Sequence, residues 1–257
     1  MSLHLCFIIP VYNHAAEASM LIDRLQPFGH QVILVNDASE PVQTEVLRRL
    51  AAGRGWVHLV EHHKNGGKGA AVKTGLKEAV ARGFTHALQI DADGQHDTAD
   101  VPKLISLAQQ HPSAVIAGQP IFDDSIPRSR LFARYLTHVW VWVETLSFVI
   151  RDSMCGFRIY PLTSVAQLLH TSHLGSRMDF DPEILVRLYW MGVEVISMPT
   201  RVTYPEGGKS HFRMVEDNLL ITRMHTRLFF GMLWRAPMLL SRKPSIGAPS
   251  RSGESER

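Results

Sequence analysis

The chain has 257 residues, of which 45% are hydrophobic and 20% are charged, and its mean hydropathy is −0.03. This composition is that of a folded globular protein, and it excludes a wholly disordered chain, a collagen and a polytopic membrane protein. Two cysteines, Cys6 and Cys155, are too few for a disulfide framework, and the net charge of +3 permits an anionic partner without specifying one.

Short apolar runs alternate with helix-like segments through the first half of the chain. Buried strands are expected at 5–11, 31–36, 57–61, 86–90 and 114–117. Helices are expected between them, at 15–25, 42–51, 70–81 and 100–110. Continuous apolar strands that alternate with helices predict an α/β fold, in which a mainly parallel central sheet carries helices on both faces. Polar residues directly after each strand then gather at the carboxyl edge of the sheet, where such folds bind ligands.

The second half of the chain is less regular. It predicts a long aromatic-rich helix at 130–150, a strand at 156–160, a helix at 182–190, a strand at 193–198 and a loop at 204–212. From residue 214 to 233 the apolar residues repeat at helical spacing again. The tail from residue 241 is rich in Ser, Arg, Gly and Pro, a composition typical of disorder.

No segment of the sequence reads as a targeting signal or a membrane span. The apolar run at 5–9 stops at Pro10, which makes it too short for the core of a signal peptide. No stretch of about 18 apolar residues occurs. We therefore expect a cytoplasmic protein.

The strongest chemical signal is the segment Asp91-Ala-Asp93-Gly-Gln95, which follows the fourth predicted strand. Two carboxylates one residue apart can converge on one hard cation as the chain leaves the sheet, and Gln95 adds a neutral oxygen. Such oxygen ligands suit Mg²⁺ or Mn²⁺. The alternative is a capped turn, since Asp and Gly are ordinary turn residues. The position at the end of a strand favours a metal site.

A glycine-rich segment, Asn65-Gly-Gly-Lys68-Gly69, opens the helix after the third predicted strand. Small residues there expose backbone N–H groups at the positive end of the helix, which suits an anion, and Lys68 adds a point charge. It is not a Walker A loop, because Gly69 stands where that loop has Ser or Thr. The alternative is a glycine-rich turn with a surface lysine.

Polar residues also end the first two predicted strands. Pro10, Tyr12 and Asn13 end the first strand, and Asp37 ends the second. Asp37 can accept hydrogen bonds from a base or a ribose hydroxyl, and Tyr12 can pack near a base. Either segment alone is more typical of a turn or a helix cap.

Together these four segments resemble the family 2 glycosyltransferases, whose nucleotide-sugar-binding fold is called GT-A. With the later segment Asp152-Ser-Met-Cys-Gly-Phe-Arg158, the likeness is closest to the dolichyl/polyprenyl-phosphate sugar transferase branch. The resemblance covers residues 5 to 160 and implies a GT-A domain over 1–212, an amphipathic helical segment over 213–240 and a disordered tail over 241–257. The residues it implies for nucleotide binding are Pro10, Tyr12, Asn13, Asp37, Lys68 and Asp91. It implies that Asp91, Asp93 and Gln95 hold Mg²⁺ or Mn²⁺ at the diphosphate.

Two features depart from that branch. Gln119 follows Gly118 where the branch commonly has an arginine. The segments 177–183 and 204–212 resemble instead a group of bacterial family 2 enzymes without membrane spans.

The resemblance also implies a mechanism. Family 2 enzymes are regarded as inverting, so a single displacement would move a sugar from a nucleotide-sugar donor, with a UDP-sugar favoured, to a lipid-linked or glycan acceptor. A hydroxyl acceptor requires a general base, for which Asp181 and Glu183 are the candidates, with Asp152 and Asp179 behind them. Glu183 is equally well explained as a first-turn carboxylate of its helix.

A phosphate acceptor needs no base, because its second pKa is about 6, but it does need cations. The cations available for this role are Arg128, Arg130, Arg134, Arg158 and Lys209, with His211 as a further substrate contact.

The C-terminal segment 214–243 carries an apolar stripe, Trp234 and several cations, so it can lie on an anionic membrane surface. The alternative is that it packs on the catalytic domain. Both interpretations are correct if the segment 214–228 packs on the domain and the segment 229–243 lies at the cytoplasmic face of the inner membrane.

Two other functions remain open. A sugar-phosphate nucleotidyltransferase usually carries a glycine-rich, basic loop after its first strand, which the segment 10–14 does not resemble. The second alternative is a protein without catalytic activity that binds a nucleotide sugar or acts as a membrane adaptor. The presence of both Asp91 and Asp93 argues against a loss of catalytic activity. No nucleic-acid partner is expected, because only the pI of about 9.0 points to one.

Overall fold

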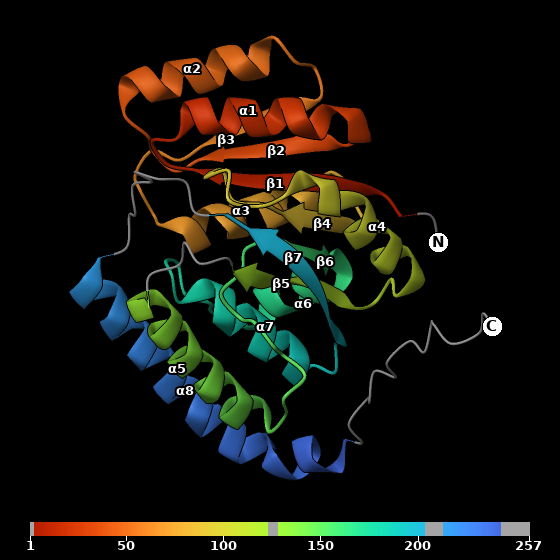
Figure 1. Ribbon diagram of the computed structural model, residues 1–257, viewed down its shortest axis with the longest axis vertical. Helices are drawn as coiled ribbons and strands as arrows, with labels where there is room; N and C mark the ends of the chain where they lie inside the picture. The colour runs from red at the N-terminus through yellow and green to blue at the C-terminus, as the bar shows by residue number, and fades with distance from the viewer. Residues whose placement is uncertain (1–2, 123–127, 204–212, 243–257) are drawn as a thin grey trace, which may run out of the picture.

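The computed structural model describes residues 3–122, 128–203 and 213–242 (Figure 1). Seven strands form one sheet in the order β3-β2-β1-β4-β6-β5-β7. They are β1 (Leu5–Val11), β2 (Gln31–Asn36), β3 (Val57–Glu61), β4 (His86–Gln89), β5 (Val115–Phe122), β6 (Arg158–Pro161) and β7 (Val195–Val202). All neighbouring strands are parallel except β6, which runs antiparallel to both β4 and β5.

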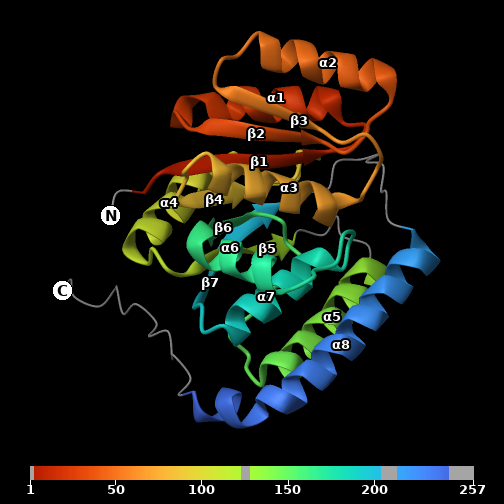
Figure 2. The same cartoon turned by 180° about the vertical axis from the view of Figure 1, so that it is seen from behind.

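Helices cover both faces of this sheet. They are α1 (Ala15–Leu25), α2 (Pro41–Ala52), α3 (Lys68–Ala81), α4 (Val101–Gln110), α5 (Arg128–Thr145), α6 (Leu162–Thr171), α7 (Phe180–Trp190) and α8 (Met214–Ser241). Helices α1, α2 and α4 lie on one face, and α3, α6 and α7 lie on the other, as Figures 1 and 2 show from opposite sides. Helices α5 and α8 run side by side beyond the β5–β7 end of the sheet.

Side chains alternate between the two faces of the sheet along each strand, and this explains why the strand sequences are continuously apolar. Leu5, Phe7 and Ile9 of β1 pack into the core shared with α1, α2 and α4. Cys6 and Ile8 of the same strand pack into the core shared with α3, α6 and α7. Successive side chains of a strand point to opposite faces, so a strand that is covered on both faces needs apolar residues at every position.

The α/β fold expected from the sequence is confirmed, and β1, β2 and β3 have the expected bounds. Strand β5 is longer than expected, because it pairs with β7 as far as Phe122. Helix α6 was not expected. Its buried apolar residues, Leu162, Val165 and Leu168, span less than two turns, which is too short a pattern to stand out.

Helix α8 is longer than expected and packs on the protein along its whole length. Met224, Leu228, Met232 and Leu239 are buried in the same core as Trp190 of α7. The half after residue 228 also packs on the protein through Met232 and Leu239, while Phe230 and Trp234 on its other side are exposed, and the membrane contact of that half stays a prediction. Among the described residues, no helix combines the length and the apolar character that crossing a bilayer requires.

Several cations that we expected to face a membrane face the protein instead. Arg227 contacts Glu183, Arg235 lies 4.6 Å above the ring of Trp190, and Arg242 donates to the Trp190 carbonyl oxygen at 2.7 Å. The loop 204–212 and the tail from residue 243, for which we expected a loop and disorder, lie outside the described residues.

Candidate active site

Three charged side chains meet at the carboxyl edge of the sheet, and we call them the charge cluster. Lys68 is the first residue of α3, Asp91 follows β4, and Asp181 lies in the first turn of α7. The Lys68 ammonium donates to Asp91 Oδ2 at 2.7 Å and lies 2.8 Å from Asp181 Oδ2. The sequence analysis identified all three residues, but the structure shows that they contact one another.

Burial and charge act in opposite directions on this cluster. Burial alone would lower the pKa of Lys68, but the charges of Asp181 and Asp91 outweigh it and hold that pKa above its usual value. Burial alone would raise the pKa of Asp91, but Lys68 and then His96 outweigh it and hold that pKa well below its usual range. Lys68 and Asp91 are therefore charged at neutral pH, and the carboxylates of Asp91 and Asp181 converge on one ammonium group.

The carboxylates of Asp91 and Asp93 fit a divalent cation. Oδ1 of Asp91 is buried and has no hydrogen-bond partner among the described residues. Oδ1 of Asp93 accepts from the Gln95 N–H at 3.1 Å. Burial, and then the charge of Asp91, raises the pKa of Asp93. A divalent cation would satisfy the orphaned oxygen and remove this repulsion, and carboxylate oxygens are the ligands that Mg²⁺ and Mn²⁺ take.

The protein supplies an incomplete ligand set for such an ion. Over the described part of the chain, no three His, Cys, Asp or Glu side chains converge as a metal site. Gln95 takes part in the turn through its backbone, where its carbonyl oxygen accepts from the Thr203 N–H at 3.1 Å. An ion held by Asp91 and Asp93 would need further oxygens from a bound molecule.

A glycine lets the backbone after Cys155 approach Asp91. A Cβ atom at Gly156 would lie 2.5 Å from Asp91 Oδ2, closer than any side chain can come. The next residue, Phe157, stacks on the ring of His96, with 5.1 Å between ring centroids. The segment that begins at Asp152 therefore forms one wall of the candidate metal site.

Asp37 holds the glycine-rich loop in place. Its Oδ1 accepts from the Gly66 N–H at 2.9 Å, and its Oδ2 accepts from the Gly67 N–H at 2.8 Å. Gly67 has a φ of +93°, which favours glycine, and a Cβ there would lie 2.6 Å from the Ser176 carbonyl oxygen. These contacts fix the loop that presents Lys68. The contact of Asp37 with a base or ribose stays a prediction.

The other residues expected at the nucleoside lie at the same edge of the sheet. Pro10 pairs with Val35 in β1, and Tyr12 and Asn13 follow that strand. Asn13 has a φ of +58°, and its Oδ1 accepts from the Glu40 N–H at 2.8 Å. The end of β1 is thus tied to the segment after Asp37.

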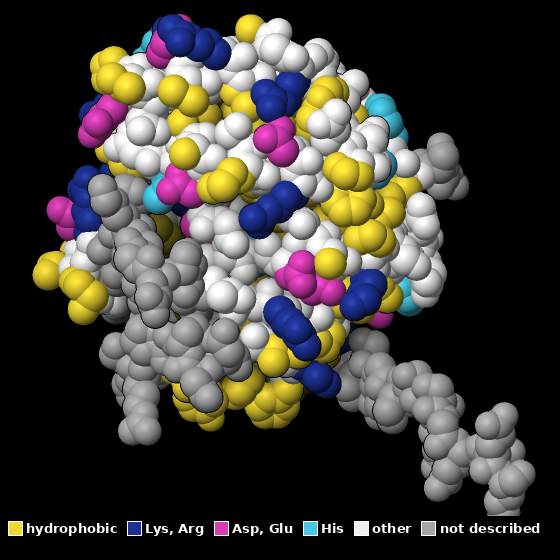
Figure 3. All heavy atoms as spheres, turned by 45° about the horizontal axis from the view of Figure 1, so that its top comes forward, with side chains coloured by type: hydrophobic (Ala, Val, Ile, Leu, Met, Phe, Trp, Pro, Cys, Tyr) yellow, Lys and Arg dark blue, Asp and Glu magenta, His cyan; other side chains and the backbone are white. Residues whose placement is uncertain are grey.

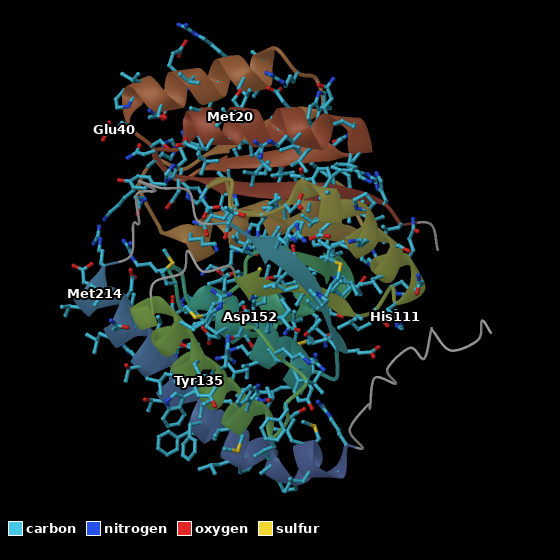
Figure 4. All side chains as sticks on the ribbon, viewed as in Figure 1. Met20, Glu40, His111, Tyr135, Asp152 and Met214 are labelled. Atoms are coloured by element: carbon cyan, nitrogen blue, oxygen red, sulfur yellow. The ribbon has the colours of Figure 1, made fainter. Side chains whose placement is uncertain are left out.

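Asp152, expected as a reserve base, is held by several donors at once. Arg134 donates to both of its oxygens, at 2.6 and 2.7 Å, and the Cys155 N–H donates to Oδ1 at 2.8 Å. Burial would raise the pKa of Asp152, but the hydrogen bond from His138 and the charge of Arg134 outweigh it and hold that pKa well below its usual range. Figure 4 shows Asp152 inside the molecule, between the sheet and α5. Its contacts are those of a structural ion pair.

Glu183, the second expected base, is fully buried and also paired. Its Oε1 accepts from Arg187 Nε at 2.9 Å, and its Oε2 accepts from the Gly175 N–H at 2.8 Å. Arg227 of α8 lies 3.3 Å from Oε2. These contacts link α7 to α8 and to the preceding loop, so they favour the helix-start interpretation over a base. The other reserve carboxylate, Asp179, accepts from the Arg177 N–H at 3.0 Å.

The two described cations among those expected at an acceptor phosphate, Arg134 and Arg158, are held by contacts within the protein. Arg158 is completely buried, and its guanidinium donates to the carbonyl oxygens of Asp181 at 2.7 Å and Ser153 at 2.6 Å. Arg134 is paired with Asp152. Residues 128 and 130 begin α5, but their side chains lie outside the described atoms, as do Lys209 and His211. Arg158 thus fixes the backbone of Asp181 through its carbonyl oxygen.

The sequence analysis missed Gln89 as a site residue. Its Nε2 donates to Asp181 Oδ1 at 3.2 Å, and its Oε1 accepts from the Tyr160 hydroxyl at 3.3 Å. A fully buried amide in an apolar strand was the available signal, because buried polar groups require partners.

The ion pair of Asp152 gives a first prediction. Asp152→Asn should lower the free energy of unfolding at neutral pH by about 3–5 kcal/mol, because Arg134 would lose its buried counter-ion. The native pKa lies below the unfolded value of about 3.9, so the stabilisation is present above roughly pH 4 and is lost as the pH falls. Urea denaturation of both proteins at neutral pH and at about pH 3 measures this.

The matched control is Asp23→Asn, which breaks the exposed pair with Arg54 (2.7 Å). It should cost no more than about 1 kcal/mol, since exposed pairs contribute little. Equal losses in the two variants would contradict a structural role for Asp152.

Comparison with known proteins gives a family match and similar relatives. Residues 6–168 match the family described as Glycosyl transferase family 2. The chain is 26% identical over 245 residues to dolichyl-phosphate beta-glucosyltransferase ALG5A of Trichomonas vaginalis, covering 87% of this chain and 74% of the relative. It is 28% identical over 230 residues to the dolichyl-phosphate beta-glucosyltransferase of Drosophila melanogaster, covering 81% of this chain and 69% of the relative.

A solved structure shows the same fold. The structure of glucosyl-3-phosphoglycerate synthase from Mycobacterium tuberculosis, in complex with Mn²⁺, UDP-glucose and phosphoglyceric acid, has a TM-score of 0.62 and covers 90% of this chain and 80% of its own. The two chains are 13% identical, so this likeness establishes the GT-A fold alone.

Proposed function

The chain belongs to glycosyl transferase family 2, and from this premise we propose that it transfers a sugar from a nucleotide-sugar donor to a lipid-linked phosphate. Two of its relatives are named as dolichyl-phosphate glucosyltransferases. The fold supports the donor half of this proposal, because the charge cluster and the glycine-rich loop lie at the edge where parallel sheets bind nucleotides.

The contacts of the four candidate bases support the acceptor half of the proposal, and one of the four, Asp179, accepts from the Arg177 N–H. Asp152 and Glu183 are buried in ion pairs with arginines, and Asp181 is bound by Lys68 and Gln89. A base must take a proton from the acceptor, and a carboxylate held by a cation is a poor one. A phosphate acceptor has a second pKa of about 6, so it is already an anion at neutral pH and needs no base.

A nucleotide-sugar donor and a phosphate acceptor together define the reaction. A phosphate oxygen of the acceptor attacks the anomeric carbon of the sugar, the bond from that carbon to the donor diphosphate breaks, and the nucleoside diphosphate leaves with the electron pair. A single displacement inverts the anomeric centre, so an α-linked donor gives a β-linked product. The names of both relatives specify that linkage.

The donor diphosphate is placed beside Asp91 and Asp93. When bound there, Mg²⁺ or Mn²⁺ supplies charge neutralisation for the departing diphosphate. The ammonium of Lys68 and the N-terminal end of α3 are further positive groups at this position. Asp37 contributes by holding the loop that carries Lys68, and a UDP-sugar is the proposed donor.

The proposed acceptor also requires contact with a membrane surface. Helices α5 and α8 expose apolar side chains at Leu131, Tyr135, Leu136, Trp140, Val143, Met214, Val215, Leu219, Phe230, Leu233, Trp234, Met238 and Leu240. Figure 3 shows hydrophobic side chains along the lower edge of the molecule, the edge at which both helices lie in Figure 1. Trp234 is 86% exposed, and such residues bind the interface of a bilayer.

Membrane contact gives a second prediction. The double variant Phe230→Glu/Trp234→Glu should bind anionic liposomes at least about tenfold more weakly, because two large apolar groups no longer enter the interface. Sedimentation of the protein with liposomes at low salt measures this. Val42→Glu, at a 75% exposed residue of α2, is the control and should bind as wild type does. Wild-type protein that stays in the supernatant would contradict the proposal.

The direct test of the function is a transfer assay. Labelled UDP-glucose, Mn²⁺ and dolichyl phosphate should yield label that extracts into organic solvent and is released by mild acid. A parallel series with GDP- and dTDP-sugars identifies the base that the enzyme accepts. If no nucleotide sugar gives an extractable product but one of them labels a glycan, the acceptor is a hydroxyl and Asp181 becomes the base to examine.

A further inference from the structure

A groove of about 400 Å³ lies between α5 and α8, outside the charge cluster. Its lining is mainly apolar and includes Leu136 and Trp140 of α5, Ile221 and Phe229 of α8, and Met154. The lining residues include no Lys, Arg, Asp or Glu within the described part of the chain. The groove therefore suits an uncharged apolar group, and its volume falls in the range of about 300–1,000 Å³ that small-ligand sites occupy.

Buried contacts fix the two walls of this groove. Nδ1 of His225 on α8 lies 2.7 Å from Glu144 Oε1 on α5, and both side chains are buried. The Glu144 carbonyl oxygen accepts from the Trp190 indole at 2.9 Å, which ties α5 to α7. The ring of Trp140 packs against those of His225 and Phe229, at 6.1 and 6.3 Å between centroids. These contacts fix the position of α5 relative to α8.

The groove comes near the candidate metal site at Met154. Met154 lines the groove, and Gly156, two residues later, contacts the carboxylate of Asp91. Two residues of chain span at most about 7 Å, so a molecule that lies along Met154 can place its end near Asp91. Other parts of the groove adjoin the exposed apolar side chains Leu136, Trp140 and Phe230.

We propose that this groove holds the first isoprene units of the acceptor, with the phosphate directed past Met154 toward Asp91. The inference rests on the proposed function, since it supplies the site for the chain of that lipid phosphate. A lining with large apolar side chains and without Lys, Arg, Asp or Glu favours the hydrocarbon over the phosphate, although His225 and four Thr or Asn residues also line it. The far end of the chain leaves along the apolar surface of α5 and α8. The groove therefore determines which lipid phosphates are substrates.

The test fills the groove without touching the charge cluster. Thr226 is an exposed residue of α8 that lines the groove, and Thr226→Trp places an indole in it. Equilibrium dialysis with farnesyl phosphate, in the absence of donor, should show binding that is weaker by at least about tenfold, equivalent to about two buried methylene groups. Thr171→Trp on α6, also at an exposed threonine, should bind as wild type does.

Chain length supplies a second measurement that needs no variant. Wild-type protein should bind farnesyl phosphate at least about tenfold more tightly than dimethylallyl phosphate, because the longer chain buries more apolar surface. Equal affinity for the two phosphates, or a Thr226→Trp variant that binds farnesyl phosphate as wild type does, would overturn the groove assignment. If Thr226→Trp does not fold, Thr222→Trp, one turn earlier in the groove, replaces it.

These readouts separate the groove from the function. Farnesyl phosphate that binds in a Thr226-dependent way while no nucleotide sugar is turned over would support the groove and overturn the proposed reaction. Transfer to lipid phosphates that is indifferent to both chain length and Thr226→Trp would support the reaction and overturn the groove.

Discussion

Asp93→Ala should lower kcat for glycosyl transfer by about 10³-fold, because the donor diphosphate would lose the cation that neutralises it as it leaves. The Asp93→Ala variant should keep the wild-type fold. Asp93 is partly exposed, and its carboxylate accepts a local hydrogen bond from the N–H of Gln95, two residues away. Thermal unfolding within about 2 °C of wild type, with Mn²⁺-dependent binding of UDP abolished in calorimetry, is the expected combination.

Asp97→Ala is the matched control for this experiment. Asp97 follows in the same segment, is exposed, and likewise accepts from a nearby backbone N–H, that of Ala99 at 2.9 Å. It lies outside the candidate metal site, so its kcat and its Mn²⁺ requirement should match those of wild type. Metal-dependent UDP binding that persists in Asp93→Ala would show that the ion lies elsewhere.

Lys68→Met should both destabilise the protein and reduce transfer. Asp91 and Asp181 would lose the cation between them, and breaking a buried pair by removing one partner costs about 3–5 kcal/mol. Transfer should fall by about 10²-fold or more, since an oriented positive charge beside the diphosphate is lost. Urea denaturation measures the first effect, and initial rates at saturating donor measure the second.

Two comparisons make the Lys68 experiment specific. Adding Asp181→Asn to Lys68→Met should restore part of the stability, because one of the uncompensated carboxylates is removed as well. Lys103→Met, which removes an exposed lysine from its pair with Asp100 (3.2 Å), should change stability by no more than about 1 kcal/mol, because Asp100 keeps its hydrogen bond from Thr200. A Lys68→Met protein as stable as wild type would contradict the charge cluster.

The sequence predicted the sheet and the edge at which the candidate site lies, because both depend on local patterns. Apolar runs of five to seven residues define β1, β2 and β3, and the polar residue after each strand marks the carboxyl edge. Asp91 and Lys68 stand at such element ends, so their types and positions could be read directly. Their mutual contact could not, since it depends on how α3 packs against β4.

The roles of the candidate bases could not be predicted for the same reason. Asp152 and Glu183 are ordinary acidic residues in the sequence. Glu183 has one partner in its own helix, Arg187, but Arg134 and Arg227 come from other elements. Arg134 lies 18 residues from Asp152, and Arg227 lies 44 residues from Glu183. Tertiary packing reveals that Arg134 neutralises Asp152 and that Arg227 joins Arg187 at Glu183. These contacts favour a phosphate acceptor over a hydroxyl acceptor, two alternatives that the sequence left open.

Helix α8 shows the opposite failure. The pattern over 214–233 correctly predicted a helix, but its cations were expected to lie on an anionic membrane surface. Arg235 and Arg242 instead contact the Trp190 side chain and backbone. A basic residue on a helix can pack its stem and donate to backbone carbonyls, so charge alone did not identify the exposed face.

The central claim is that the enzyme glycosylates a phosphate and needs no general base to do so. The most direct measurement compares polyprenyl phosphate with the corresponding polyprenol as acceptors for labelled UDP-glucose in the presence of Mn²⁺. We predict extractable product from the phosphate alone, with Asp152→Asn, where it folds, retaining the activity. Product from the alcohol at a comparable rate would contradict the account, because it would require a base that the carboxylate ion pairs do not leave available.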